Sequence, residues 1–210
     1  MQRVTALTRQ KRNPDRINVF LDETFAFGLA EIAAARLQIG QMLSPEEIAE
    51  LKRQDSFEKA KQSAFKLISY RPRSVAEVAR NLREKSYDEA VVSEVIARMQ
   101  ELQLLDDHAF ALYWIEQRET FKPRSFMALR QELMQKGISR DIIDEALANV
   151  DETAVAHKAA AKRIARWQHL PADQLRDKMG GYLQRRGFGY GIIREVIDEI
   201  IENLSHEHGN

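Results

Sequence analysis

The stretch that decides the fold reads Lys122-Pro123-Arg124-Ser125, then Leu133 and Lys136-Gly137-Ile138, then Ile142-Ile143. Related stretches lie about fifty residues before and after it, with apolar residues in the same register. A basic residue precedes glycine in two of the three copies, and a large apolar residue always follows. Repeats of this period are typical of stacked supersecondary units that bury their faces against one another, and such arrays favour a binding surface over a catalytic cleft.

Apolar periodicity predicts three helices in each copy. The predicted helices begin with one at Phe57 and continue with Val75–Lys85, Glu89–Leu102, Asp107–Arg118, Ser125–Lys136, Ser139–Ala148, Thr153–Gln168, Ala172–Arg186 and Tyr190–Leu204. We therefore expect three-helix units over residues 55–105, 106–152 and 153–205, followed by a tail over 206–210. The predicted fold class is mainly α, with the tandem repeats forming an elongated curved array.

The first 54 residues differ from the rest and predict a small β-hairpin and helix extension. Val4–Thr8 reads as a strand, and Ile17–Leu21 can pair with Thr24–Leu29 across the turn Asp22-Glu23. Ala30–Leu37 reads as a helix that ends near Gly40. Ser44-Pro45-Glu46-Glu47 has the pattern of a helix start, with a serine cap, a proline and a glutamate three residues after the cap. That helix is expected to end near Gln54.

Composition excludes several classes of protein. Of 210 residues, 44% are hydrophobic and 30% charged, which is typical of a globular domain rather than a disordered chain. The absence of cysteine removes disulfides, thiolate nucleophiles and cysteine metal sites. The N-terminus lacks the apolar core of a secretory signal, and no apolar run reaches the length of a membrane span. We expect a cytoplasmic, monomeric protein with no membrane contact.

The formal net charge is zero, but the charges are unevenly distributed. Residues 1–16 carry +4, residues 22–58 carry −5 and residues 156–194 carry +7. A neutral chain can therefore present a strong local positive field, and a polyanionic partner stays compatible with this composition.

The sharpest candidate site is a basic helix face formed by Lys158, Lys162, Arg163 and Arg166. At 100° per residue these side chains span about 140° of the helix, and Ala160, Ala161, Ile164 and Trp167 occupy the opposite arc. Arg185 and Arg186 add charge within the same repeat. A solvated outer face is the ordinary interpretation of such a pattern. Contact with DNA phosphates or an acidic protein groove is the alternative, and arginine suits either target.

A second candidate set flanks the loops between the first and second helices of the repeats. It consists of Arg71, Arg73, Lys122 and Arg124. The ordinary role of each is to satisfy free carbonyls at helix ends. As a set, they place equivalent cations on successive repeats, which would let a repeat array follow a periodic filament.

Catalytic, metal and cofactor sites are not predicted. His108, His157 and His169 are isolated and lack the spacing of metal ligands on a helix. Gly180-Gly181 and the glycines at 187, 189 and 191 lack the strand-glycine-helix context of a phosphate-binding loop. Asp106 and Asp107 are expected to cap the helix that follows them. We therefore expect a non-enzymatic protein without a cofactor.

At this point the residues resemble the RecX family, the regulatory proteins of bacterial recombination. The resemblance covers nearly the whole chain, and Ile17–Asp22 with Phe27-Gly28-Leu29 looks like the N-terminal hairpin of longer members. Its other anchors are Arg71-Pro72-Arg73-Ser74, Leu104-Leu105-Asp106-Asp107 with Phe110-Ala111, Lys122-Pro123-Arg124-Ser125 and Gln135-Lys136-Gly137-Ile138-Ser139.

The resemblance implies a body of tandem three-helix units that binds the RecA recombinase. Such proteins lodge along the groove of the RecA filament on single-stranded DNA and inhibit filament growth, ATP hydrolysis and strand exchange. That would place the protein in homologous recombination, DNA repair and the SOS response. The chain departs from the family pattern at Ser86, where glycine is common, and at Pro171-Ala172-Asp173, which replaces Pro-Arg-Ser in the third unit.

The alternative function is a helical module that acts directly on nucleic acid. Three-helix units resemble helix-turn-helix geometry, and the basic third repeat would contact phosphates. The second and third helices carry few Asn, Gln or Arg residues for reading base edges, so weak direct binding is expected.

Overall fold

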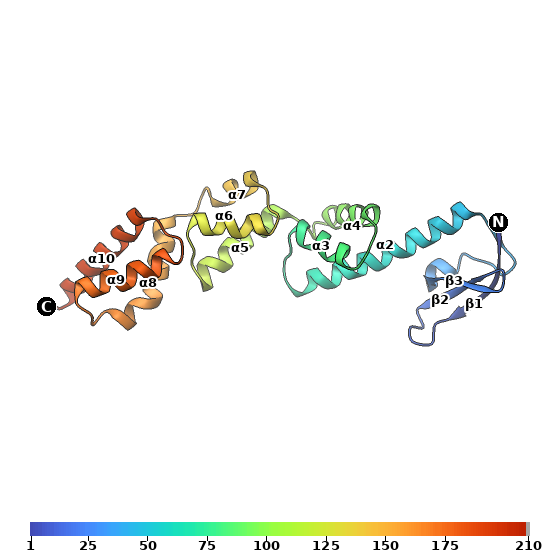
Figure 1. Cartoon of the computed structure of the whole chain (residues 1–210), viewed down its shortest axis with the longest axis horizontal. Helices are drawn as coiled ribbons and strands as arrows, with labels where there is room; N and C mark the ends of the chain where they lie inside the picture. The colour runs from blue at the N-terminus through green and yellow to red at the C-terminus, as the bar shows by residue number, and fades with distance from the viewer. Residues whose placement is uncertain (209–210) are drawn as a thin grey trace. The chain divides into compact units, whose positions relative to one another are not determined.

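The structure is a computed structural model that describes residues 1–208, with side chains through His206. It is mainly helical, with ten helices and four strands in the described part, which confirms the predicted fold class (Figure 1). The chain divides into two compact units. The first unit contains Met1–Arg71 and Val78–Leu104; the second contains Pro72–Glu77 and the chain from Leu105 onward.

The N-terminal sheet has the strand order β3-β2-β1-β4, and its paired strands are antiparallel. Its strands are β1 (Gln2–Arg9), β2 (Arg16–Leu21), β3 (Thr24–Ala30) and the short β4 (Met42–Leu43). The predicted hairpin across Asp22-Glu23 is confirmed. These two turn residues have φ angles of 48° and 71°, the left-handed backbone that a tight two-residue hairpin requires. One face is buried through Val4, Val19 and Leu29, each fully covered.

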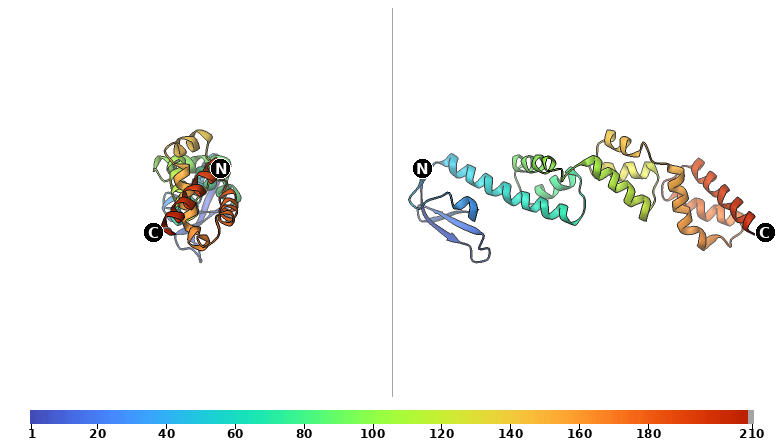
Figure 2. Two further views of the ribbon diagram at one scale, coloured as in Figure 1. Left: turned by 90° about the vertical axis from the view of Figure 1, so that its left-hand side faces the viewer. Right: turned by 180° about the vertical axis from the view of Figure 1, so that it is seen from behind.

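Two helix predictions in this region were wrong. The helix expected over Ala30–Leu37 is a single turn, α1 (Glu31–Ala34). The helices expected on either side of residue 54 are one helix, α2 (Pro45–Tyr70), so the predicted boundary between residues 54 and 55 falls inside it (Figure 2). Its predicted start is confirmed, because Ser44 and Glu47 form a reciprocal capping box. Asp55 is 8% exposed and lies where a break was expected, because it pairs with Arg16 of β2 at 2.9 Å.

The first repeat consists of the second half of α2 with α3 (Val75–Glu84) and α4 (Glu89–Glu101). Helix α4 packs on α2 within the first unit. Small residues of α2, Ala60 and Ala64, are fully buried and allow this close approach.

The second unit contains the other two repeats. The second repeat is α5 (Asp107–Phe121), α6 (Phe126–Gln135) and α7 (Arg140–Leu147), around a core that includes Phe110, Leu129 and Ile143. The third is α8 (Glu152–Trp167), α9 (Ala172–Gln184) and α10 (Tyr190–His208), around Met179, Leu183 and Val196. In both repeats the three helices pack against one another and bury their apolar faces in a shared core (Figure 1).

The predicted register of the repeats is confirmed. Leu82, Leu133 and Leu183 are all fully buried at the equivalent position of the second helix. After each second helix comes a basic residue and then a serine or glycine. That serine or glycine has a left-handed backbone: φ is 62° at Ser86, 82° at Gly137 and 92° at Gly187. The turn into the third helix therefore has the same geometry in all three repeats.

Candidate partner interface

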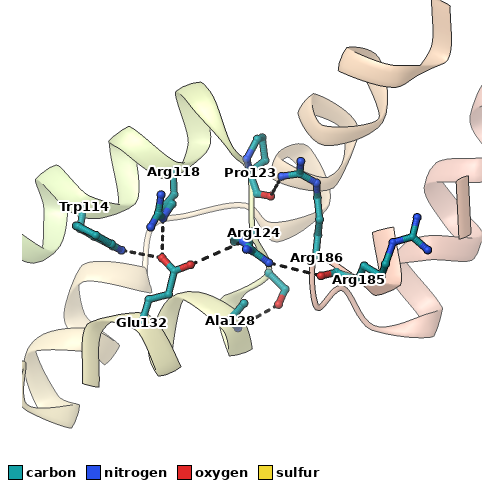
Figure 3. Close-up of polar contacts among 9 residues, drawn as sticks. Trp114, Arg118, Pro123, Arg124, Ala128, Glu132, Arg185 and Arg186 are labelled. Atoms are coloured by element: carbon teal, nitrogen blue, oxygen red, sulfur yellow. Dashed lines mark hydrogen bonds and ion pairs between the residues drawn. The ribbon is translucent and has the colours of Figure 1, made fainter. Parts of the chain in front are cut away.

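Within the second unit, the second and third repeats meet at a joint made of two loops. The backbone N–H of Ser125, the N-cap of α6, donates to the carbonyl of Arg186 at 3.1 Å. Gly187 follows, and a Cβ added there would lie 2.5 Å from Ser125 Oγ and 3.3 Å from Ala128 Cβ. Only glycine fits this position, because it combines a left-handed backbone with no side chain. Figure 3 shows the Arg186 side chain at the Pro123 carbonyl and Arg124 at the Arg185 carbonyl, while the Arg185 side chain points away from this loop.

A carboxylate completes the joint. The N–H of Phe126, at the first position of α6, donates to Glu152 Oε1 of α8 at 2.9 Å. Helix α6 therefore begins with one free N–H satisfied by Ser125 and another by the next repeat.

Residues 72–77 make equivalent contacts to the second repeat, also within the second unit. Ser74 Oγ donates to the Lys136 carbonyl at 2.6 Å, and the Val75 N–H donates to Asp107 Oδ1 at 2.9 Å. A Cβ added at Gly137 would overlap Ala76 Cβ. The fifty-residue sequence repeat is thus explained by a repeated joint: a Pro-Arg-Ser loop meets a basic-glycine turn and an acidic helix start.

The two departures from the family pattern lie where no such joint is made. Ser86 is exposed. Pro171 is the N-cap of α9 and makes no side-chain capping bond. A serine there would meet no following three-helix unit within the described chain.

Two of the candidate arginines are structural parts of this joint. Arg186 Nη1 donates to the Pro123 carbonyl at 2.8 Å, and Arg124 Nη1 lies 3.5 Å from the Arg185 carbonyl. Arg124 Nε lies 3.7 Å from Glu132, which also accepts bonds from Trp114 at 2.9 Å and Arg118 at 2.6 Å (Figure 3). Arg124 and Arg186 therefore satisfy carbonyls at helix ends, the ordinary role weighed for such residues.

The basic helix α8 also contacts the preceding repeat. Lys158 Nζ pairs with Glu119 at 2.9 Å, and Lys162 Nζ donates to the carbonyl of Thr120 near the end of α5. Arg163 and Arg186 lie over the ring of Tyr182, 5.4 Å and 4.7 Å from its centroid. Ala161 was expected on the buried arc of α8 but is exposed, because α9 and α10 cover the side of α8 that carries Ala159 and Ala160, whereas Ala161 lines a surface hollow.

Lys158, Lys162 and Arg186 thus contact the end of α5 and the loop after it, and the other candidate cations of this region lie close to them in the chain. We call this set the basic joint: Lys122, Lys158, Lys162, Arg163, Arg166, Arg185 and Arg186. Lys122 is the C-cap that follows the last residue of α5. Lys122, Arg166 and Arg185 are exposed. A surface hollow of about 650 Å³ lies beside it, lined by Glu116, Glu119, Thr120, Lys158, Ala161 and Lys162. The seven cations of the joint outnumber the two carboxylates that line this hollow, Glu116 and Glu119, so the joint presents a local positive field.

Arg71 and Arg73 are placed differently. Arg71 ends α2 in the first unit, and Arg73 precedes Ser74 in the second. Both side chains are half-buried and interact with other residues.

Two of the three candidate histidines lie near single carboxylates. His157 Nε2 lies 3.1 Å from Glu199, and His108 Nε2 lies 3.7 Å from Glu145. No group of three His, Asp or Glu side chains in the described residues is arranged to hold a metal ion. Within those residues no helix has the length and apolar character needed to cross a membrane.

The acidic residues of the joints were missed by sequence reasoning. Asp106 caps α5 as predicted, accepting from His108 and Ala109, but Asp107 accepts from Val75 instead. Burial is the main cause that raises the pKa of Asp107 above its ordinary value. The available signal was the acidic pair that opens both repeats, Asp106-Asp107 and Asp151-Glu152.

Comparison with known sequences shows which protein family has this architecture. Four family models match: the regulatory protein RecX N-terminal domain over residues 2–44, and the first, second and third three-helix domains of RecX over residues 60–99, 106–147 and 151–197. The regulatory protein RecX of Clostridium botulinum (strain Alaska E43 / Type E3) is 30% identical over 206 residues, covering 95% of this chain and 96% of its own length. The chain belongs to the RecX family.

Other RecX proteins agree. The regulatory protein RecX of Bacillus subtilis (strain 168) is 31% identical over 202 residues, covering 94% of this chain and 76% of its own length. A crystal structure of regulatory protein RecX matches with a TM-score of 0.69 at 27% identity, covering 94% of this chain and all of that one. The crystal structure of RecX from Lactobacillus salivarius matches with a TM-score of 0.61 at 26% identity, over 70% of this chain and 97% of that one. The RecX family is regulatory, which supports a regulatory role here.

Proposed function

We propose that this protein is a non-enzymatic regulator that binds a RecA-type recombinase and its filament on single-stranded DNA. In this proposal it inhibits filament growth, ATP hydrolysis and strand exchange, and acts as a cytoplasmic monomer. Membership in the RecX family supports the regulatory role.

The observation that carries the proposal is the basic joint. Its exposed members include Arg166, Arg185 and Lys122, the C-cap of α5. They lie close in the chain to Lys162 and Arg186, which protein carbonyls already hold. Fixed cations lose little side-chain freedom on binding, so they favour association with a polyanionic surface. A filament that carries DNA presents such a surface.

The test is DNA-dependent ATP hydrolysis by a RecA-type recombinase, measured with increasing amounts of this protein. We expect inhibition at amounts below one protein per recombinase subunit, because a blocked filament end stops growth for the subunits behind it. The protein by itself should hydrolyse no nucleotide. Unchanged hydrolysis over a wide concentration range, with an active recombinase, would contradict the proposal.

The second candidate function is a helical module that binds DNA directly. The same basic joint favours it, since phosphate contacts need only fixed cations. A salt titration of DNA affinity without recombinase separates the two candidates. A direct binder should be tight at low salt and lose affinity steeply as salt rises, whereas a recombinase regulator should need the filament for tight binding.

A further inference from the structure

An exposed aromatic ring lies in the chain segment that the cations of the basic joint contact. Phe121 is the last residue of α5 and is 72% exposed. A phenylalanine normally stabilises a fold by burying its ring, so a ring left in solvent beside a well-packed core does nothing for the fold.

The same position is aromatic in the first repeat. Tyr70 is the last residue of α2 and is also 72% exposed. In both repeats the ring is followed by a basic residue, proline, arginine and the N-cap serine. The two rings have equal exposure and occupy the same position of the first and second repeats, so the ring is a repeated feature. Tyr70 belongs to the first compact unit and Phe121 to the second.

Cations contact the residues that precede and follow Phe121 in the chain. Lys162 donates to the carbonyl of Thr120, the residue before the ring, and Lys158 pairs with Glu119, the residue before that. Lys122 follows the ring directly, and Arg186 donates to the carbonyl of Pro123. These contacts fix charged side chains from α8 and from the end of α9 near the backbone that carries the ring.

This combination matches the chemistry of unpaired nucleotides. A single-stranded nucleic acid offers the flat face of a base for stacking and a phosphate on either side for the cations. A duplex keeps its base faces stacked inside, so it can use the cations but not the ring. An acidic protein segment would use the cations too, but it carries no repeated flat surface that the rings of the first two repeats would serve.

We propose that Phe121 and the lysines around it form a stacking site for an unpaired DNA base, with Lys122 and Lys162 facing the adjacent phosphates. This deepens the proposed function by naming unpaired bases as what the basic joint contacts. Tyr70 with Arg71 provides the equivalent site of the first repeat.

The test uses the full-length protein without recombinase, so its failure leaves recombinase regulation standing. Two fluorescein-labelled probes of equal length are compared by anisotropy at low salt: an oligodeoxythymidine and an abasic strand with the same phosphodiester backbone. We expect the oligodeoxythymidine to bind more tightly. Phe121→Ala should weaken its binding by at least about fivefold, the loss of one stacked base, and leave the abasic strand unchanged.

Two further variants control for the fold and for the ring. Met127→Ala removes an apolar side chain that is 69% exposed in the same repeat but lies on α6, and it should change neither affinity. Phe121→Trp keeps a flat ring and should retain the preference for bases. Circular dichroism spectra of all variants should match, because Phe121 is not part of the core.

Several results would overturn the proposal. They are the absence of oligodeoxythymidine binding by the unaltered protein, equal losses of both probes in Phe121→Ala, and no loss of either. A variant that binds both probes normally but loses affinity for DNA-free recombinase would assign the ring to a protein contact instead.

Discussion

The backbone N–H of Ser125 donates a 3.1 Å hydrogen bond to the carbonyl of Arg186, sixty-one residues further along the chain. The bond joins the cap of a second-repeat helix to the turn of the third repeat, where Gly187 leaves room for the serine side chain. Ser74 makes the equivalent contact with its hydroxyl, which donates to the carbonyl of Lys136. The repeated sequence pattern is therefore the pattern of a contact between repeats as much as of the helices inside each one.

Glycine should be essential at the joint. Gly187→Ala should lower the free energy of unfolding by about 2–4 kcal/mol, because alanine is strained at a φ of 92° and its Cβ would meet Ser125 Oγ. Urea unfolding followed by circular dichroism measures the change. The matched change is Ser86→Gly, where φ is 62° and the residue is exposed. It should be neutral or stabilise the protein by about 0.5 kcal/mol. An alanine at 187 that is as stable as the glycine would refute this account of the joint.

Asp107 should make stability depend on pH in a defined direction. Burial first, and the charge of Asp106 second, raise its pKa above the ordinary value of 3.8, although the Val75 N–H lowers it. Ionisation therefore costs more in the folded protein than in the unfolded chain. The cost grows as the pH rises from the unfolded pKa through the folded one and is constant above it.

Two variants of Asp107 test this. Asp107→Asn keeps an oxygen for the Val75 N–H and cannot ionise, so its stability relative to the unaltered protein should rise with pH across that window and then level off. Asp107→Ala removes the acceptor as well as the charge, so its pH profile should have the same slope but lie about 1 kcal/mol below that of Asp107→Asn. Urea unfolding between pH 3 and pH 7 distinguishes them. Parallel pH profiles for the asparagine variant and the unaltered protein would contradict the assignment.

The buried leucines should anchor their repeats. Leu82→Ala and Leu133→Ala should each cost about 2–5 kcal/mol, because both side chains are fully buried and their removal leaves a cavity. Thermal unfolding measures the loss. Leu112→Ala is the matched control, since Leu112 is 47% exposed on α5 and should change stability by about 0.5 kcal/mol or less. Equal melting temperatures for all variants would mean that the repeat register is misassigned.

Charge reversal on the basic joint should weaken binding without unfolding it. Lys162 and Arg163 share the face, but Lys162 also holds the Thr120 carbonyl, so Arg166→Glu with Arg185→Glu is the cleaner change. Affinity for the recombinase–DNA filament, measured by anisotropy at two salt concentrations, should fall, and its salt dependence should flatten because fewer ions are released on binding.

The control for charge is Arg130→Glu with Arg140→Glu, which changes the net charge equally on α6 and α7. It should bind more tightly than the joint variant. If both double variants bind like the unaltered protein and keep its circular dichroism spectrum, Arg166 and Arg185 belong to a solvated surface, and the contact should be sought among Arg71, Arg73, Lys122 and Arg124.

Removing one partner of the buried ion pair in the first unit should destabilise the protein more than removing both partners. Arg16 donates to both carboxylate oxygens of Asp55, at 3.0 Å and 2.9 Å, and to the Gly28 carbonyl at 2.8 Å. Arg16→Met should cost about 3 kcal/mol, because it leaves a buried carboxylate with only Lys59 as its ion partner. Adding Asp55→Leu should recover part of the loss in urea unfolding. A double variant less stable than the sum of both single variants would contradict this.

The elements that could be predicted from sequence were those set by local rules. Ser44, Ser125 and Ser139 cap the helices that their spacing predicts, because a cap depends on residues within one turn. The hairpin at Asp22-Glu23 and the register of Leu82, Leu133 and Leu183 followed from short-range turn chemistry and apolar period. The break expected after Gln54 failed because Asp55 is buried inside one continuous helix, where it pairs with Arg16 of a strand 39 residues away in the chain.

The sequence by itself thus determined the helices of the three repeats from Val75 onward, the cap at Ser44 and the presence of a basic third unit. The tertiary structure decided what those basic residues touch. Arg124 and Arg186 meet carbonyls of the neighbouring repeat, Lys158 and Lys162 reach back to α5, and Phe121 stays in solvent among them. The physical reason is that a cap or an apolar stripe is fixed by neighbours in the chain, whereas the partner of a long charged side chain is fixed by how separate helices pack.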